Sequence, residues 1–168
     1  MKTKRLHKFS PCREAVEYMS TQKNSTLAWQ NCERGDWMLW IAKKLNVDDK
    51  KLTMAKAMCT KQVEHLMKDQ RSKDALQACF DYVNGKITRE QLDAAAVAAY
   101  AAAADAAAAD AAAAVAAYAD AAAYAAADAA AAAYAAAANA RENSLRKSAD
   151  ICREYLTEEV LSKYKRLR

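Results

Sequence analysis

Glycine and proline are almost missing from this chain, whose 168 residues include two glycines and one proline. Typical usage is about 7% for glycine and about 5% for proline. Because these residues build turns and interrupt helices, their scarcity argues against a sheet-based fold and favours helices joined by short turns. We predict an all-α fold, a multi-helix bundle with a long alanine-rich helix or helical hairpin in its C-terminal half.

Signals for secretion and membrane insertion are missing as well. The basic N-terminal segment MKTKRLHK leads into no apolar core of a signal peptide. The alanine-rich stretch has the length of a membrane span, but alanine is weakly apolar and aspartate recurs within it. One aspartate at mid-membrane costs roughly 2.5–3.5 kcal/mol. We therefore expect a cytoplasmic protein without a membrane partner.

Paired spacings of reactive or metal-binding residues are missing too. The five cysteines form no CxxC or CxxH pair, and His7 and His65 are the only histidines. This pattern predicts reduced thiols that pack as small hydrophobic side chains. A zinc site built from distant helices and a Cys59–His65 nucleophile pair are alternatives, but each needs a geometry that the spacing does not supply. We predict no catalytic residue, no metal ligand and no cofactor, and hence no enzyme.

The net charge of +5 arises at the two ends of the chain. Residues 2–8 contain four lysines or arginines, and so do residues 163–168. Such clusters attract nucleic acid or anionic surfaces, but neither carries the interleaved aromatic residues of a nucleic-acid reader. We expect solvated basic tails at 1–8 and 163–168 on a single helical domain that spans 1–168.

Helix-boundary signals divide the chain into short amphipathic helices over 9–86 and long alanine-rich helices over 88–164. The boundaries are marked by capping residues, glycine or proline. Ser10-Pro11 is expected to start a helix over 11–20, and Asn24 to Thr26 the next helix. Asp36 is expected to start the helical segment WMLWIAKKL, and residue 49 a helix over 49–69. Ser72 is expected to start a helix that ends at Asn84-Gly85.

The strongest local signal is ITREQL at residues 87–92. Thr88 at the N-cap and Gln91 three residues later form a capping box, and Ile87 with Leu92 supplies a hydrophobic staple. This signal begins a helix that continues into the alanine-rich stretch, and alanine has the highest helix propensity.

Alanine makes up 36 of the 47 residues from 94 to 140. One helix of that length would extend about 70 Å, well beyond a domain whose radius of gyration is about 15 Å. The bulky residues also change face near 119–123: Val97, Tyr100, Val115 and Tyr118 share one arc, and Tyr124, Tyr134, Leu145, Cys152, Leu156 and Val160 share roughly the opposite arc. A hairpin of closely packed methyl groups is favoured over a single rod, with tyrosine and valine at the seams against the N-terminal helices.

Three segments carry a resemblance to a known family. SPCREAVEYM, STLAWQNCERGDWMLWIAKKL and NGKITREQLDAA, followed by the alanine-rich stretch, resemble the immunity proteins of bacterial polymorphic toxin systems. Members of that family show a cysteine-bearing first helix, a W-x-x-C-x-R-x-D-W-x-x-W segment and a long alanine-rich region. The corresponding residues are Cys12 in the first segment and Trp29, Cys32, Arg34, Asp36, Trp37 and Trp40 in the second. The resemblance implies toxin neutralisation by binding.

The candidate residues fall into a structural set and a partner-binding set. Cys12, Trp29, Cys32, Trp37 and Trp40 are predicted to be structural. The predicted partner-binding residues are Tyr100, Tyr118, Tyr124, Tyr134, Arg34 and Asp36, because tyrosine and arginine are frequent hot spots at interfaces. Arg34 and Asp36 flank Gly35, and either they form an ion pair or Asp36 caps the next helix.

Three functions follow from these patterns. The leading one is an immunity-type protein that binds and occludes a protein partner such as a toxin. The second is a counter-defence protein of a phage or mobile element that sequesters an effector or a nucleotide signal, which would require a lysine- or arginine-lined pocket with an aromatic platform. The third is a structural component that forms homo-oligomers through its alanine-rich helices.

Overall fold

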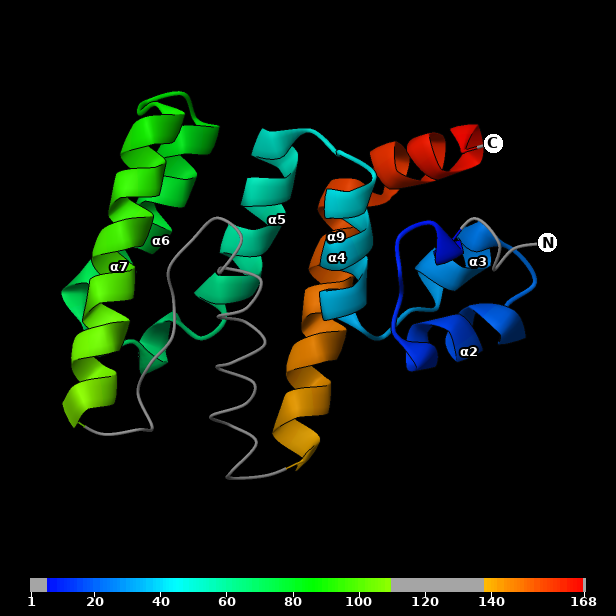
Figure 1. Cartoon of the computed structure of the whole chain (residues 1–168), viewed down its shortest axis with the longest axis horizontal. Coiled ribbons are helices and arrows are strands. Elements are labelled where there is room, and N and C mark those ends of the chain that lie inside the picture. Colours follow the sequence, from blue (N-terminus) through cyan, green and yellow to red (C-terminus); the bar gives the residue numbers. More distant parts are fainter. Residues whose placement is uncertain (1–5, 110–137, 168) are drawn as a thin grey trace.

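The computed structural model describes residues 6–109 and 138–167, and every regular element in these two ranges is helical (Figure 1). This confirms the predicted all-α bundle. The elements are α2 (Arg13–Thr21), α3 (Ser25–Gln30), α4 (Gly35–Lys44), α5 (Asp49–Lys61), the short 3₁₀ helix η1 (Glu64–Leu66), α6 (Gln70–Val83), α7 (Arg89–Ala109) and α9 (Ala138–Arg166).

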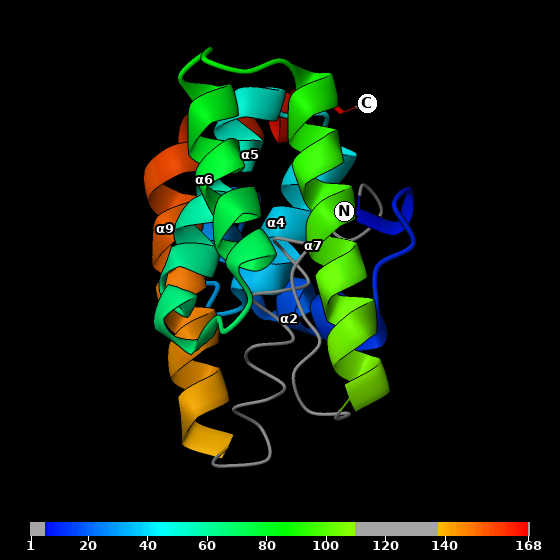
Figure 2. The same cartoon turned by 90° about the vertical axis from the view of Figure 1, so that its left-hand side faces the viewer.

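Helix α9 is the element around which the N-terminal half is arranged. It packs against α3, α4 and α5, and α5 in turn packs against α6. Helices α6 and α7 form a pair at one end of the molecule, while α2 and α3 lie at the other end (Figures 1 and 2). The last helix of the chain is therefore central in the fold.

The main core lies where α9 meets α3, α4 and α5. Its most deeply buried members include Ala42 and Cys152, both fully inaccessible to solvent, and Met38, with 1% of its surface exposed. A second core cluster joins α5, α6 and α7 through Ala57, Leu76, Cys79 and Leu92. These two clusters place α5 between the halves of the bundle.

Gly35 allows α4 to begin directly against α9. A methyl group at this position would lie 2.7 Å from the carbonyl carbon of Ser148 and 2.8 Å from the amide nitrogen of Ala149, and it would overlap the Ser148 Cβ. Such contacts are shorter than any that carbon atoms tolerate. The pair Gly35 and Ala149 therefore brings the two helix backbones together without an intervening side chain.

Several predicted caps are confirmed. The Asn24 side chain accepts a hydrogen bond from the Leu27 amide at 2.8 Å. In the capping box, the Thr88 amide donates to Gln91 Oε1 at 2.8 Å and the Gln91 amide donates to Thr88 Oγ1 at 3.3 Å. Gly85 follows α6 with a φ of +73°, the left-handed conformation that favours glycine.

The predicted start of the first helix was wrong. Ser10 has a φ of +54°, and the residue that precedes α2 is Cys12, whose side chain makes no capping hydrogen bond. An N-cap residue normally has an extended backbone, so the left-handed conformation of Ser10 removes it from that position. Pro11 consequently precedes the helix instead of opening it.

Two further boundaries differ from the prediction. Helix α6 begins at Gln70 because the Asp69 carboxylate accepts the Arg71 amide at 2.8 Å, and Ser72 lies buried inside the helix. Helix α5 ends at Lys61 and does not continue to residue 69. Leu66, which falls inside the range predicted for that helix, lies in η1 with 57% of its surface exposed.

The two ends of the chain are less solvated than predicted. Leu6 is buried in the main core, and α9 remains helical to Arg166. Tyr164 is buried in the same core, and Lys163 donates a hydrogen bond to the Asn46 carbonyl and pairs with Glu159 at 3.1 Å. The prediction of a solvated tail is therefore wrong for Leu6, Lys163 and Tyr164, because apolar side chains anchor both segments, whereas Lys165 and Arg166 are exposed.

The buried residues of α7 are leucine and alanine, and not valine or tyrosine. Leu92, Ala96 and Ala99 are buried, whereas Val97 and Tyr100 have 56% and 53% of their surfaces exposed. The prediction that Val97 and Tyr100 mark a packed seam is thus wrong: Ala99 packs with alanines of α6 and α7, where a larger side chain would separate the helices.

The remaining predictions for the alanine-rich half fall partly inside and partly outside the residues that the structure describes. Cys152, Leu156 and Val160 of α9 are buried on one face, as predicted. The proposed hairpin near 119–123 and the bulky residues Val115, Tyr118, Tyr124 and Tyr134 lie outside the described residues. Within the described residues, none of the helices combines the length and apolar character needed to cross a bilayer.

Replacing Gly35 by alanine should destabilise the fold strongly. The new methyl group would meet backbone atoms of α9 that cannot rotate away, and overpacking of this kind costs about 3 kcal/mol or more. Gly85→Ala is the control, because the added methyl group would meet only the end of the Lys50 side chain, at an ordinary contact distance of 3.8 Å. There the positive φ alone opposes a side chain, at about 1–2 kcal/mol. Urea denaturation measures both variants, and equal losses of stability would contradict the close approach of α4 and α9.

Stability should also depend on the ionisation of Glu159. Burial opposes its ionisation, but the Asp48 amide at 2.8 Å and the ammonium groups of Lys163 and Lys51 outweigh that cost and lower the pKa of the carboxyl. A group with a depressed pKa stabilises the fold above its unfolded value, about 4.3, and this contribution is lost as the pH falls through the folded value.

We therefore expect Glu159→Gln to lower the urea midpoint at pH 7. The difference from the wild type should shrink as the pH falls below the unfolded value of about 4.3. It should disappear below the lowered folded pKa, where the wild-type carboxyl is itself protonated. A difference of the same size at pH 7 and pH 3 would show that the charge of Glu159 makes no contribution.

Candidate functional site

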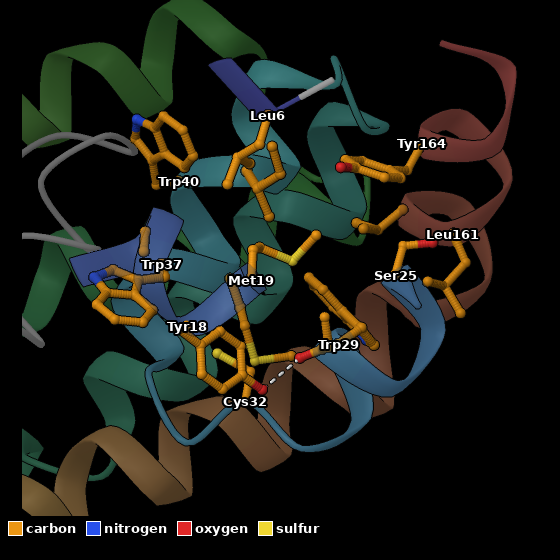
Figure 3. Close-up of a pocket in the computed structure, with 15 residues that line it drawn as sticks. Leu6, Tyr18, Met19, Ser25, Trp29, Cys32, Trp37, Trp40, Leu161 and Tyr164 are labelled. Atoms are coloured by element: carbon orange, nitrogen blue, oxygen red, sulfur yellow. Dashed lines mark hydrogen bonds between the residues drawn. The ribbon is translucent and has the colours of Figure 1, made fainter. Parts of the chain in front are cut away.

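The tryptophan-rich motif forms the wall of one partly open apolar pocket. Trp29, Cys32, Trp37 and Trp40 all line it, and about 80 Å³ of free volume remains. The other lining residues are Leu6, Ala15, Tyr18, Met19, Ser25, Ala28, Met38, Ile41, Val160, Leu161 and Tyr164. Residues that are scattered in sequence over α2, α3, α4 and the C-terminal half of α9 thus meet at one place (Figure 3).

Trp29 is a buried lining residue of the pocket, and its orientation is fixed. It is 5% exposed, and its indole N–H donates to Thr157 Oγ1 of α9 at 2.8 Å. The Thr157 hydroxyl in turn donates to the Arg153 carbonyl at 2.6 Å. A buried indole N–H requires such a partner, and this hydrogen bond sets the orientation of the ring relative to α9.

The loop between α3 and α4 is held from α9 by one arginine. Arg153 donates to the carbonyl of Cys32 at 2.7 Å and to the carbonyl of Gln30 at 3.1 Å. The Cys32 thiol is directed at the Arg34 carbonyl at 3.6 Å, and burial raises the pKa of this thiol. Cys32 therefore acts as a small apolar wall residue and is a poor nucleophile at neutral pH.

Tyr18 closes the pocket from the side of α2. Its hydroxyl donates to the Ala28 carbonyl at 2.8 Å, the interaction marked in Figure 3. Burial raises the pKa of Tyr18 to about 12, so the phenol remains a neutral donor. Its ring lies 5.9 Å from that of Trp37, at an angle of 51°. Tyr18 therefore connects α2 to both α3 and α4.

Arg34, Asp36 and Trp37 form a stacked ion pair beside the pocket. Arg34 Nε and one terminal nitrogen donate to the two Asp36 oxygens at 2.9 and 2.6 Å. The guanidinium also lies 4.3 Å from the centre of the Trp37 ring. Of the two alternatives for Asp36, the ion pair is the one that forms, and the carboxylate raises the pKa of Arg34.

The pocket and its margin differ in chemistry. Among the described residues, no lysine, arginine, histidine or carboxylate lines the pocket. At the margin, the side chains of Arg34 and Asp36 are 36% and 29% exposed and neutralise each other. In the described part of the chain, no group of three or more potential metal ligands was found. The arrangement is suited to holding an apolar group beside a neutral, hydrogen-bonding edge.

The structure separates the predicted site residues into different regions. Arg34 and Asp36 lie together at the start of α4, whereas Tyr100 lies on α7 at the opposite end of the bundle (Figure 1). The other three candidate tyrosines, Tyr118, Tyr124 and Tyr134, lie outside the described residues. The described candidates therefore do not form one surface.

The residues predicted to be structural differ in burial. Trp29 and Cys32 are buried, and Trp37 and Trp40 pack half-buried against the main core. Cys12 is exposed and occupies the position before α2.

Sequence reasoning missed several pocket residues. Tyr18 and Met19 could have been found, because they share a helical face with Ala15 and all three line the pocket. Leu6 and Tyr164 stood in segments dominated by positive charge, where the pattern predicts solvation.

Comparison of the chain with protein-family models, curated proteins and solved structures finds no match.

The burial of the thiols predicts their reactivity. Cys12 is exposed, whereas Cys32, Cys59, Cys79 and Cys152 are buried. Burial also raises the pKa of Cys79, to about 11, which further suppresses the reactive thiolate. A chromogenic thiol reagent at pH 8 should therefore titrate one cysteine rapidly in the folded protein and all five in denaturant without reductant. Rapid reaction of a second thiol in the folded protein would contradict this burial.

Proposed function

We propose that this protein is a non-enzymatic, immunity-type binding protein that occludes a protein partner such as a toxin. The supporting observation is the convergence of the motif Trp29, Cys32, Arg34, Asp36, Trp37 and Trp40 on one pocket and its margin. The resemblance to immunity proteins rests on these same residues. We assign the partner surface to this region.

Arg34, Trp37 and Trp40 have the properties of an interface hot spot. Tryptophan and arginine are enriched at such sites. Trp37 and Trp40 are half-buried, so each has a fixed part and an accessible part. Stacking on Trp37 and the bidentate contact with Asp36 fix the guanidinium of Arg34, so little side-chain entropy remains to be lost on binding.

The other two functions have weaker support. A nucleotide-sequestering protein needs cationic groups for phosphate, and the described residues that line this pocket include no lysine or arginine. Self-assembly through the alanine-rich half would use the exposed Val97 and Tyr100 of α7. Because this second surface lies away from the motif, mutation can separate the two possibilities.

The proposal predicts that a gene beside this one encodes a toxin-domain protein, and the absence of such a gene would count against it. Expressed alone in a bacterial host, that protein should arrest growth, and coexpression of this chain should restore it. Arg34→Ala should weaken the purified complex tenfold or more, since loss of a hot-spot side chain costs about 2 kcal/mol or more. Titration calorimetry measures the affinity, and circular dichroism confirms that the variant remains folded.

Tyr100→Ala is the matched control. It removes an exposed large side chain from α7, which α5 separates from the motif-bearing helix α4 in Figure 1, and should leave both affinity and growth rescue unchanged. Weakening by Tyr100→Ala but not by Arg34→Ala would move the interface to α7. Absence of any complex with the neighbouring gene product would refute the immunity-type function.

A further inference from the structure

The geometry points to a specific occupant of the motif pocket: one compact, uncharged aliphatic side chain of the protein partner, of about the size of leucine. This inference rests on the proposed function and names the chemistry by which the same site selects its partner.

The volume limits the occupant to a single small group. The pocket has about 80 Å³ of free space, roughly half of a cavity of about 150 Å³ that holds a benzene molecule. A branched aliphatic group meets this limit, whereas an indole or a nucleobase does not. The thioethers of Met19 and Met38 adapt to the shape of such a group.

The lining excludes charge. The described residues place no carboxylate, ammonium or guanidinium in the pocket wall. Against this wall, a charged occupant would lose its hydration without gaining a partner, which is strongly unfavourable. The Tyr18 hydroxyl is already bonded to the Ala28 carbonyl, and the Trp29 N–H to Thr157. An apolar occupant sacrifices no hydrogen bond, and its burial contributes about 25 cal/mol per Å².

The walls are fixed before any occupant arrives. In Figure 3, Trp37 and Trp40 lie on one side of Met19, and Trp29 lies on the other. Trp29 is tied to α9, and Trp37 is held between the Tyr18 ring and the Arg34 guanidinium. Because these walls need little ordering on binding, one inserted side chain can act as an anchor.

The three tryptophans of the chain all line this pocket, so their fluorescence reports its occupancy. Chloroform is a compact, apolar quencher of indole emission. We expect it to quench saturably, with a dissociation constant of about 1 mM or tighter, and cyclopentane to relieve the quenching by competition. Trichloroacetate carries the same trichloromethyl group with a negative charge, and its quenching should remain linear with concentration.

A pocket-filling variant supplies the specific test. Ala15 lines the pocket from α2 and is 7% exposed. Ala15→Leu should weaken chloroform binding and toxin binding tenfold or more while the melting temperature stays equal or rises. Ala98→Leu, the same change on an exposed position of α7, should alter neither. If Ala15→Leu fails to fold, Met19→Ala replaces it, and its enlarged pocket should bind bromobenzene more tightly than the wild type does.

The outcomes separate this inference from the proposed function. Two results would overturn the pocket assignment: quenching by chloroform that stays linear with concentration, or chloroform binding to Ala15→Leu that equals binding to the wild type. If Ala15→Leu loses chloroform but still neutralises the toxin with wild-type affinity, the pocket accepts a free small molecule and the side-chain inference is wrong, while the immunity-type function stands. If wild-type protein binds chloroform but not the toxin, the proposed function fails, and the inference that depends on it fails with it.

Discussion

The close approach of α4 to α9 at Gly35 is the constraint on which the rest of the structure depends. The two backbones meet where Gly35 faces Ser148 and Ala149, with no room for a side chain between them. This contact sets the depth at which α4 enters the core, and therefore the position of Trp37 and Trp40 two and five residues later. A helix displaced by one methyl group would withdraw both rings from the pocket.

Helix α9 then fixes the opposite wall of the same pocket. Arg153 holds the α3–α4 loop through two carbonyls, Thr157 orients Trp29, and Val160 supplies part of the lining. These residues are spaced three or four apart, so one face of one helix carries them all. The motif near residue 30 and the C-terminal helix form a single structural unit, although they are far apart in the sequence.

Helix caps could be predicted from the sequence, whereas contacts between residues far apart in the chain could not. The capping box at Thr88 and the left-handed Gly85 were predicted because each depends on neighbours within a few residues. The burial of Leu6, the close approach at Gly35 and the pocket itself depend on α9, which no local pattern reveals. The prediction for the alanine-rich helix was wrong for another reason. On α7 the bulky residues Val97 and Tyr100 face outward, and a helical wheel made mostly of alanine does not indicate which face is buried.

The site has a defined shape and no net charge, and under the binding function proposed above these two properties determine how it would discriminate between partners. Arg34 and Asp36 satisfy each other, so neither offers a strong, unscreened field to a partner. Discrimination must then come from the fit of an apolar group and from the direction of the remaining donors on Arg34. A mismatched side chain would leave the pocket empty or would bury an unpaired polar atom, at a cost of about 1–3 kcal/mol. Selectivity of this kind arises after contact, through slower dissociation of the correct partner, and not through long-range attraction.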